Sequence, residues 1–167
     1  MEALTRVCIR SLRSLGLGFS FLMLSTALAM AEPLGPVLLA NNAFVFNPRS
    51  LQWKAINEQG HVVRTGHGSG GRGYCPDIRR SCRTPTGTYS VHSKGDAGCR
   101  SSRYPVGHGG APMPYCMFFS KYYAIHGSPD VPNHNASHGC IRVLPSDARW
   151  LNHHFIQTGT TVVVKPY

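Results

Sequence analysis

The residues of this sequence best suited to chemistry are a histidine and a cysteine at the two ends of one polar loop. His126 follows the apolar run 122–125, and Cys140 opens the short apolar run 140–144, with turn-forming residues between them. Each run predicts a short buried strand. If the two strands are neighbours, the imidazole lies beside the thiol, as a cysteine nucleophile and its general base require.

The residues around Cys140 fit the same chemistry. A free thiol has a pKa of about 8.5, so it needs a neighbouring base to become a good nucleophile. Gly139 permits a tight turn before the cysteine, and backbone N–H groups near it could stabilise an oxyanion. Arg142 would share one side of a strand with Cys140 and could bind a carboxylate there. From residue types alone, a buried structural cysteine with surface histidines is an equal alternative.

The spacing of these residues is more specific than an isolated pair. His126-Gly127, followed by Ser137-His138-Gly139-Cys140-Ile141-Arg142, resembles the signature of the L,D-transpeptidase catalytic domain. The TPTGTY stretch at 84–89 and the region from Pro145 onward extend the resemblance over most of the chain, from about Leu51 to the last residue. That family cross-links bacterial peptidoglycan through a cysteine acyl-enzyme.

The resemblance implies a role for each matching residue. Cys140 corresponds to the nucleophile, His126 to the general base, and Arg142 to a substrate-binding residue. Four further residues are expected to support the base, the thiol or the oxyanion, namely Gly127, Ser137, His138 and Gly139. The loop 127–136 is shorter than in many members, a departure that bears on the choice of acyl acceptor.

The resemblance also implies a reaction. Cys140 would attack the amide between the third residue of a peptidoglycan stem peptide, a diamino acid, and the fourth, D-Ala, which leaves. A side-chain amine of a second stem would then take the acyl group and form a 3→3 cross-link. A lysine of an envelope lipoprotein is another possible acceptor, and water would make the enzyme an L,D-carboxypeptidase. We expect a monomer that needs no cofactor or metal.

Two other readings of the Cys140 region remain open but fit less well. A non-catalytic envelope-binding or host-contact protein on the same fold would have no use for a thiol–imidazole pair. A papain-like protease would carry a different sequence around its cysteine. We therefore favour the transferase.

Ligand-binding alternatives are weaker. A zinc site would draw on His126, His134, His138 and Cys140, but the Asn and Gly residues between them disfavour the helix that the spacing needs. The glycines at 66, 68 and 71 match G-x-G-x-x-G without a following helix. The net charge of +10 favours anionic envelope polymers as neighbours, because no basic helix or interleaved aromatic patch indicates nucleic acid.

The first 31 residues have the pattern of a secretory signal peptide. Three arginines precede an apolar segment at 15–29, and Ala29-Met30-Ala31 offers a cleavage site. A membrane anchor is the alternative, but the segment is short for a span of about 20 residues. We expect secretion across the inner membrane into the periplasm or cell envelope, with residues 32–50 as a lead-in and residues 51–167 as one catalytic domain.

The elements that must position the site are predicted to be mostly strands. Apolar or alternating runs predict strands at 51–57, 61–65, 88–92, 116–119, 122–126 and 160–165. One helix is predicted after Pro145, with an apolar face of Ala148, Leu151 and Phe155, and it ends before Gly159. The glycine-rich stretch 66–82 is expected to be a surface loop. The fold class is mainly β, and the family resemblance implies a mixed β-sandwich with one helix in the C-terminal region.

The cysteine count makes a separate prediction. Removal of a signal peptide containing Cys8 leaves five cysteines, and an odd number in an oxidising compartment leaves one thiol free. A nucleophilic Cys140 must be the free one. Four cysteines allow three pairings. We favour Cys75–Cys82 and Cys99–Cys116, because each pair would close a poorly packed segment.

Overall fold

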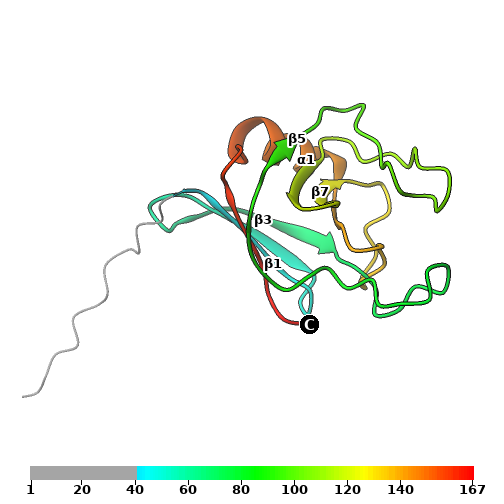
Figure 1. Cartoon of the computed structure of the whole chain (residues 1–167). Helices are drawn as coiled ribbons and strands as arrows, with labels where there is room; N and C mark the ends of the chain where they lie inside the picture. The colour runs from blue at the N-terminus through cyan, green and yellow to red at the C-terminus, as the bar shows by residue number, and fades with distance from the viewer. Residues whose placement is uncertain (1–40) are drawn as a thin grey trace, which may run out of the picture. The chain divides into compact units, whose positions relative to one another are not determined.

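The computed structural model describes residues 41–167, so the expected signal peptide and residues 32–40 of the expected lead-in lie outside the described residues. Within 41–167, nine strands form one mixed sheet in the order β4-β9-β1-β2-β3-β8-β7-β6-β5 (Figure 1). The strands are β1 (Ala43–Asn47), β2 (Gln52–Ile56), β3 (Val62–Ser69), β4 (Gly87–Ser90), β5 (Ser93–Lys94), β6 (Met117–Ser120), β7 (Tyr123–Gly127), β8 (Ile141–Val143) and β9 (Thr161–Val164).

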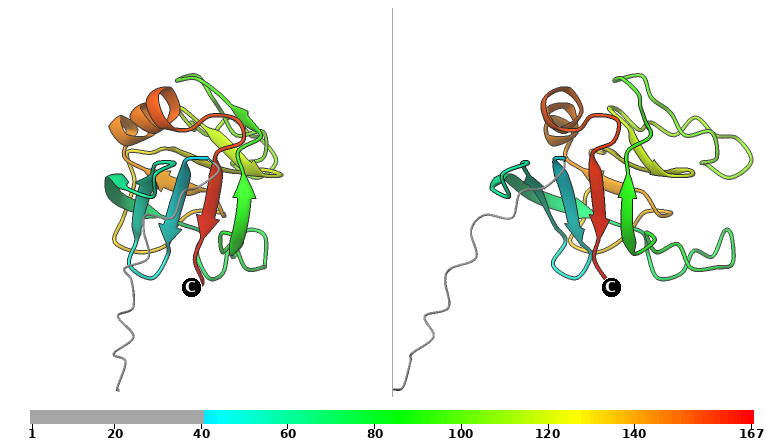
Figure 2. Two further views of the ribbon diagram at one scale, coloured as in Figure 1. Left: turned by 90° about the vertical axis from the view of Figure 1, so that its left-hand side faces the viewer. Right: turned by 60° about the vertical axis from the view of Figure 1, so that its left-hand side comes forward.

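Strand β3 connects two halves of this sheet. Its residues up to His67 pair antiparallel with β2, whereas Gly68 and Ser69 pair with β8. Figure 2 shows β1, β9 and β4 side by side, with β9 between the other two. The pairs β1–β9 and β7–β8 are parallel and the others antiparallel. The predicted fold class, mainly β with a mixed sandwich, is confirmed.

One apolar core lies between the two halves. Alternate residues of β1, β2 and β9 are buried in it, since successive side chains of a strand point to opposite faces. The largest fully buried side chains include Phe44, Phe46, Trp53, Met117, Ile125, Ile141, Leu151 and Ile156. Burial of each such side chain is worth about 1.5–3 kcal/mol. The β7 and β8 strands contribute Ile125 and Ile141, so the strands next to the predicted site are anchored in the core.

The predicted helix forms as α1 (Pro145–Trp150) and continues as a π-helical turn, η1 (Leu151–Phe155). Its inner face buries Ala148, Leu151 and Phe155, as predicted. The chain becomes extended at Ile156, earlier than the expected end near Gly159. Lys94 Nζ, from a strand that was not predicted, donates hydrogen bonds of 2.7 Å to the carbonyls of both Asn152 and Ile156. These bonds satisfy carbonyls that a helix end leaves without partners.

No helix in the described part of the chain has the length and apolar character needed to cross a membrane.

Two stretches differ from the sequence-based expectations. The glycine-rich segment 66–82 is a loop only after Ser69, because β3 continues through Gly66 and Gly68. A Cβ at Gly66 would lie 2.5 Å from the Trp53 indole, so glycine is required for the strand to pack there. Residues 43–47, which we placed in the lead-in, form β1 in the interior of the sheet between β9 and β2.

Both favoured disulfides are confirmed. Cys75 pairs with Cys82, Cys99 pairs with Cys116, and Cys140 is the free cysteine among residues 41–167. The first disulfide loop (residues 75–82) and the second disulfide loop (residues 99–116) project on the same side of the domain (Figure 1, right).

Candidate active site

The parallel pairing of β7 with β8 brings the predicted pair together. Ile125 lies opposite Ile141 and His126 lies opposite Arg142, and Cys140 directly precedes β8. His126, Cys140 and Arg142 all line one cavity of about 310 Å³, which we call the Cys140 cavity. The side chains that could form a nucleophile and its base therefore open into one space.

His126 is held as a neutral base. Its side chain is buried, and Nδ1 lies 2.9 Å from the carbonyl oxygen of Gly127. Because a carbonyl only accepts hydrogen bonds, Nδ1 carries the proton and Nε2 has a free lone pair. Burial, with a smaller contribution from the charge of Arg142, lowers the pKa of His126 to about 4, although the Gly127 hydrogen bond opposes this. At neutral pH the imidazole is uncharged.

Cys140 is held as a thiol. Burial raises its pKa, and this outweighs the opposing effects of the Ala124 backbone and the Arg142 charge. Its Sγ lies 3.9 Å from the carbonyl oxygen of Tyr122. The resting pair is therefore a thiol and a neutral imidazole, not a thiolate–imidazolium pair. The thiol proton has to move to a base as the sulfur attacks.

A tight turn presents Cys140. The Ser137 hydroxyl donates to the carbonyl of Cys140 and accepts a 3.0 Å hydrogen bond from the Gly139 N–H. Gly139 has φ of +120°, and a Cβ there would lie 2.3 Å from the Tyr123 ring. The turn thus requires glycine on both conformational and steric grounds. Because Ser137 already binds the Gly139 N–H, this particular N–H is not a free oxyanion donor.

His138 connects the two disulfide loops. Its Nε2 lies 2.8 Å from Asp77 Oδ2 in the first loop, and its ring centroid lies 4.4 Å from that of Tyr104 in the second. The Asp77 pKa is lowered overall: desolvation opposes the shift, while the hydrogen bond and the charge of His138 drive it. The expected support role of His138 therefore takes the form of contacts with both loops. Sequence reasoning missed Asp77 and Tyr104, since neither belongs to a motif.

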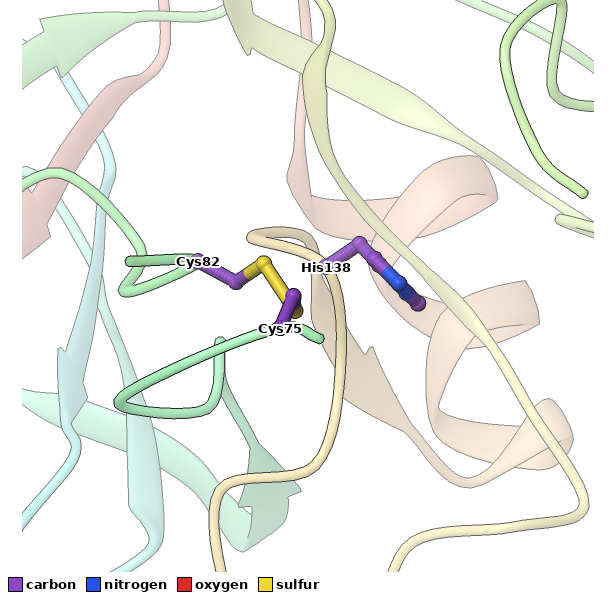
Figure 3. Close-up of side chains that lie close together, drawn as sticks. All are labelled: Cys75, Cys82 and His138. Atoms are coloured by element: carbon purple, nitrogen blue, oxygen red, sulfur yellow. A yellow bond between two sulfur atoms is a disulfide. The ribbon is translucent and has the colours of Figure 1, made fainter. Parts of the chain in front are cut away.

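Metal binding finds little support in this region. Figure 3 shows His138 beside Cys75 and Cys82, and the potential ligand atoms of the three residues lie within 4.8 Å of one another. The two sulfurs are joined in a disulfide, so they are not thiolate ligands. The zinc set that we weighed from the sequence, which includes His134, is not gathered into one cluster among the described residues.

Arg142 reaches the Cys140 cavity from β8 and pairs with an exposed acid. Its Nη1 lies 2.7 Å from Asp130 Oδ2, and the Asp130 side chain is 71% exposed. An ion pair this exposed is worth only about 0–1 kcal/mol. A substrate carboxylate could therefore replace Asp130 at the guanidinium at little cost.

The rest of the cavity wall combines three arginines with apolar, aromatic and neutral polar side chains. Residues of both disulfide loops line it, including Arg80, Arg100, Arg103 and Tyr104. Across the range 41–167, no Asp or Glu lines this cavity. The sequence is rich in arginine at 72–83, which lies mostly within the stretch 66–82 that we expected to be a surface loop. The structure turns one of these arginines toward the cavity.

The match to known proteins agrees with this geometry. The family model of the L,D-transpeptidase catalytic domain (YkuD) matches residues 42–164. No curated protein matches the chain. A solved L,D-transpeptidase from Xylanimonas cellulosilytica is 27% identical, with a TM-score of 0.64 over 78% of this chain and 63% of that one.

Two mycobacterial structures have the same fold. An L,D-transpeptidase from Mycobacterium smegmatis is 20% identical, with a TM-score of 0.62 over 75% of this chain and 59% of that one. L,D-transpeptidase 3 from Mycobacterium tuberculosis, solved with a faropenem-derived adduct, is 21% identical, with a TM-score of 0.59 over 75% and 60%. This chain thus spans less than two thirds of the length of these three structures. With the family model matching most of its length, the chain belongs to the L,D-transpeptidase catalytic domain family.

Proposed function

We propose that this protein is a secreted L,D-transpeptidase that forms 3→3 cross-links between peptidoglycan stem peptides through a Cys140 acyl-enzyme. The observation that carries this proposal is the Cys140 cavity. It combines a thiol, an imidazole whose Nε2 is free, and a guanidinium that can bind a carboxylate. Family membership gives this combination its reaction class.

In the first step, Cys140 Sγ attacks the carbonyl carbon of the diamino acid that precedes D-Ala. The thiol proton passes to His126 Nε2, and the imidazolium is stabilised because Nδ1 remains bonded to the Gly127 carbonyl. When the tetrahedral intermediate collapses, the C–N bond breaks and D-Ala leaves with the proton from His126. A thioester on Cys140 remains.

In the second step, a side-chain amine of another stem attacks the thioester. His126 takes a proton from the amine, the new amide forms, and Cys140 leaves as the sulfur group and recovers its proton. If water attacks instead, the same site acts as an L,D-carboxypeptidase. An envelope lipoprotein lysine is a further acceptor that this chemistry permits.

We place the protein in the periplasm or cell envelope, as a monomer. The two disulfides support an oxidising compartment, because such bonds persist outside the reducing cytosol. The net charge of +10 supports attraction to anionic wall polymers.

The test is incubation of the purified protein with tetrapeptide muropeptides, followed by mass spectrometry. Cross-linked dimers with free D-Ala are expected. Tripeptides without dimers would show that the protein is an L,D-carboxypeptidase and not a transpeptidase. No change in the muropeptides would favour the non-catalytic envelope-binding protein.

The matched control is Cys140→Ala. Because Cys140 contributes a thiol at the cavity and not a core side chain, this variant should lose all D-Ala release while unfolding at nearly the same denaturant concentration. The wild type should also gain a single carbapenem adduct, mapped to Cys140 and absent from the variant. Wild-type D-Ala release by Cys140→Ala would contradict the acyl-enzyme mechanism.

A further inference from the structure

A second cavity adjoins the Cys140 cavity. It has a volume of about 390 Å³ and is built entirely from residues of the two disulfide loops. The two cavities share part of their walls, through Ile78, Arg80, Ser102, Arg103 and Tyr104. A molecule bound in the second cavity would therefore lie next to the cavity that Cys140 lines.

The second cavity is lined by cations. Arg80 and Arg103 face it from opposite loops, and His108 adds an imidazole. Among the described residues, no acidic side chain lines it. Such a cavity suits a ligand with negative charge, and guanidinium groups bind a planar carboxylate with two parallel hydrogen bonds.

The two arginines are available to a ligand. Within residues 41–167, the Arg80 guanidinium makes no ion pair or hydrogen bond. The Arg103 guanidinium lies over the Tyr122 ring, 4.2 Å from its centroid. This stacking uses the face of the guanidinium and leaves its N–H edge for a ligand. Arg142, by contrast, is already paired with Asp130.

The loops that carry these arginines are held in place. Each is closed by its own disulfide, and both contact His138 through Asp77 and Tyr104. Preorganised walls reduce the ordering cost of binding. The loops that form the second cavity are therefore held by contacts to His138, which is two residues before Cys140.

We infer that the second cavity binds the acyl acceptor, by holding a peptide carboxylate between Arg80 and Arg103. The inference rests on the proposed function, because the donor must place its scissile carbonyl at Cys140 and so occupies the other cavity. The acceptor must approach the thioester from outside the donor's position, and the second cavity is next to that position because the two cavities share five lining residues. The acceptor is then a peptide with a free carboxylate. Water, or a lipoprotein lysine with no carboxylate near it, would not use this site.

The test measures binding on the Cys140→Ala protein, so that no turnover is required. Two stem tripeptides are compared by calorimetry, identical except for a free or an amidated C-terminal carboxylate. The free carboxylate should bind at least tenfold more tightly. The Arg80→Gln/Arg103→Gln double variant should lose this preference, and Arg79→Gln, which removes the same charge from the same loop outside both cavities, should keep it.

Three results would overturn the inference: equal binding of both peptides, a preference that survives in the double variant, or an equal loss of preference in Arg79→Gln. The last would mean that only the overall charge of the loop attracts the peptide. Failure of the proposed function looks different: the carboxylate preference would be present, but the wild-type protein would release no D-Ala from muropeptides.

Discussion

The strands that carry His126 and Cys140 and the two disulfide loops that face them are held by different forces. Strands β7 and β8 are paired through their backbones, and their Ile125 and Ile141 side chains are fully buried. The disulfide loops contain exposed arginines, glycines and prolines and no strand of the sheet. Their positions depend on two disulfides, on backbone hydrogen bonds within each loop and on side-chain contacts to His138.

This difference suggests a division of roles, in which the sheet positions the reacting groups and the loops bind the substrate. The sheet fixes the backbone on both sides of the thiol–imidazole pair, so changes in the loops should leave the chemistry in place. The loops supply three of the four arginines that line the cavity, so under the proposed function they select what is bound. The predictions below test whether the two regions can be disturbed separately.

The largest effect is expected from removal of the base. His126→Ala should reduce the rate of Cys140 acylation by about 10²- to 10⁴-fold, the usual loss for a general base. The rate is measured by time-resolved intact-mass analysis with a carbapenem. His126→Gln, which keeps more of the side-chain volume, is the control for packing. An acylation rate within a few-fold of wild type in both variants would mean that another group takes the thiol proton.

Opening a disulfide loop should reduce stability. The Cys99→Ala/Cys116→Ala variant should lose about 3 kcal/mol of unfolding free energy, because the disulfide closes a long loop in the unfolded chain. The Cys75→Ala/Cys82→Ala variant should lose about 2 kcal/mol, because its loop is shorter. Urea denaturation measures both. The sheet should survive in each variant, with its far-ultraviolet circular dichroism preserved. Loss of that spectrum in native buffer would show that sheet and loops are not separable.

Acid should weaken the sheet region through His126. Its pKa is about 4 when folded and about 6.5 when exposed, so the unfolded state binds more protons between these values. The unfolding free energy should therefore fall as the pH is lowered from 6.5 to 4, by about 3 kcal/mol from this residue. Comparison with His126→Gln by urea denaturation at pH 7 and pH 4 isolates the effect. An equal pH dependence in both proteins would contradict the buried neutral imidazole.

The smallest effect is expected from the residue between the two regions. His138→Gln should slow acylation of Cys140 by less than about tenfold, since its side chain contacts the loops rather than the reacting atoms. Acylation is again followed by intact mass. Asp77→Asn, which keeps the shape but loses the charge, should give a similar or smaller change. A loss as large as that of His126→Ala would place His138 in the proton transfer itself.

The sequence predicted the parts of the molecule that depend on local patterns. The apolar runs before His126 and after Cys140 predicted β7 and β8, and the cysteine count led to both disulfides. The contact of His138 with Asp77 was not predictable, because 61 residues separate them and irregular loops have no periodicity. The low pKa of His126 also needed the structure, since it depends on burial by distant residues.

Strand β1 was missed for a related reason. Its alternating Phe44 and Phe46 are only two residues, too few to separate a strand from an apolar linker. Its partner β2 is close in the sequence, but its partner β9 is more than one hundred residues away. The burial of β1 is therefore a property of the assembled sheet.

The position of β9 has a consequence for the time at which this domain can fold. Residues 161–164 lie between β4 and β1, so within the described sheet β4 has no paired strand, and β1 has only β2, until one of the last segments emerges. A chain that has left the ribosome only as far as α1 still lacks this strand, which joins β4 to β1. Such long-range pairing makes folding slow and late rather than progressive. The partly emerged chain, with the open edges of β1 and β4, is the species most in need of protection from aggregation.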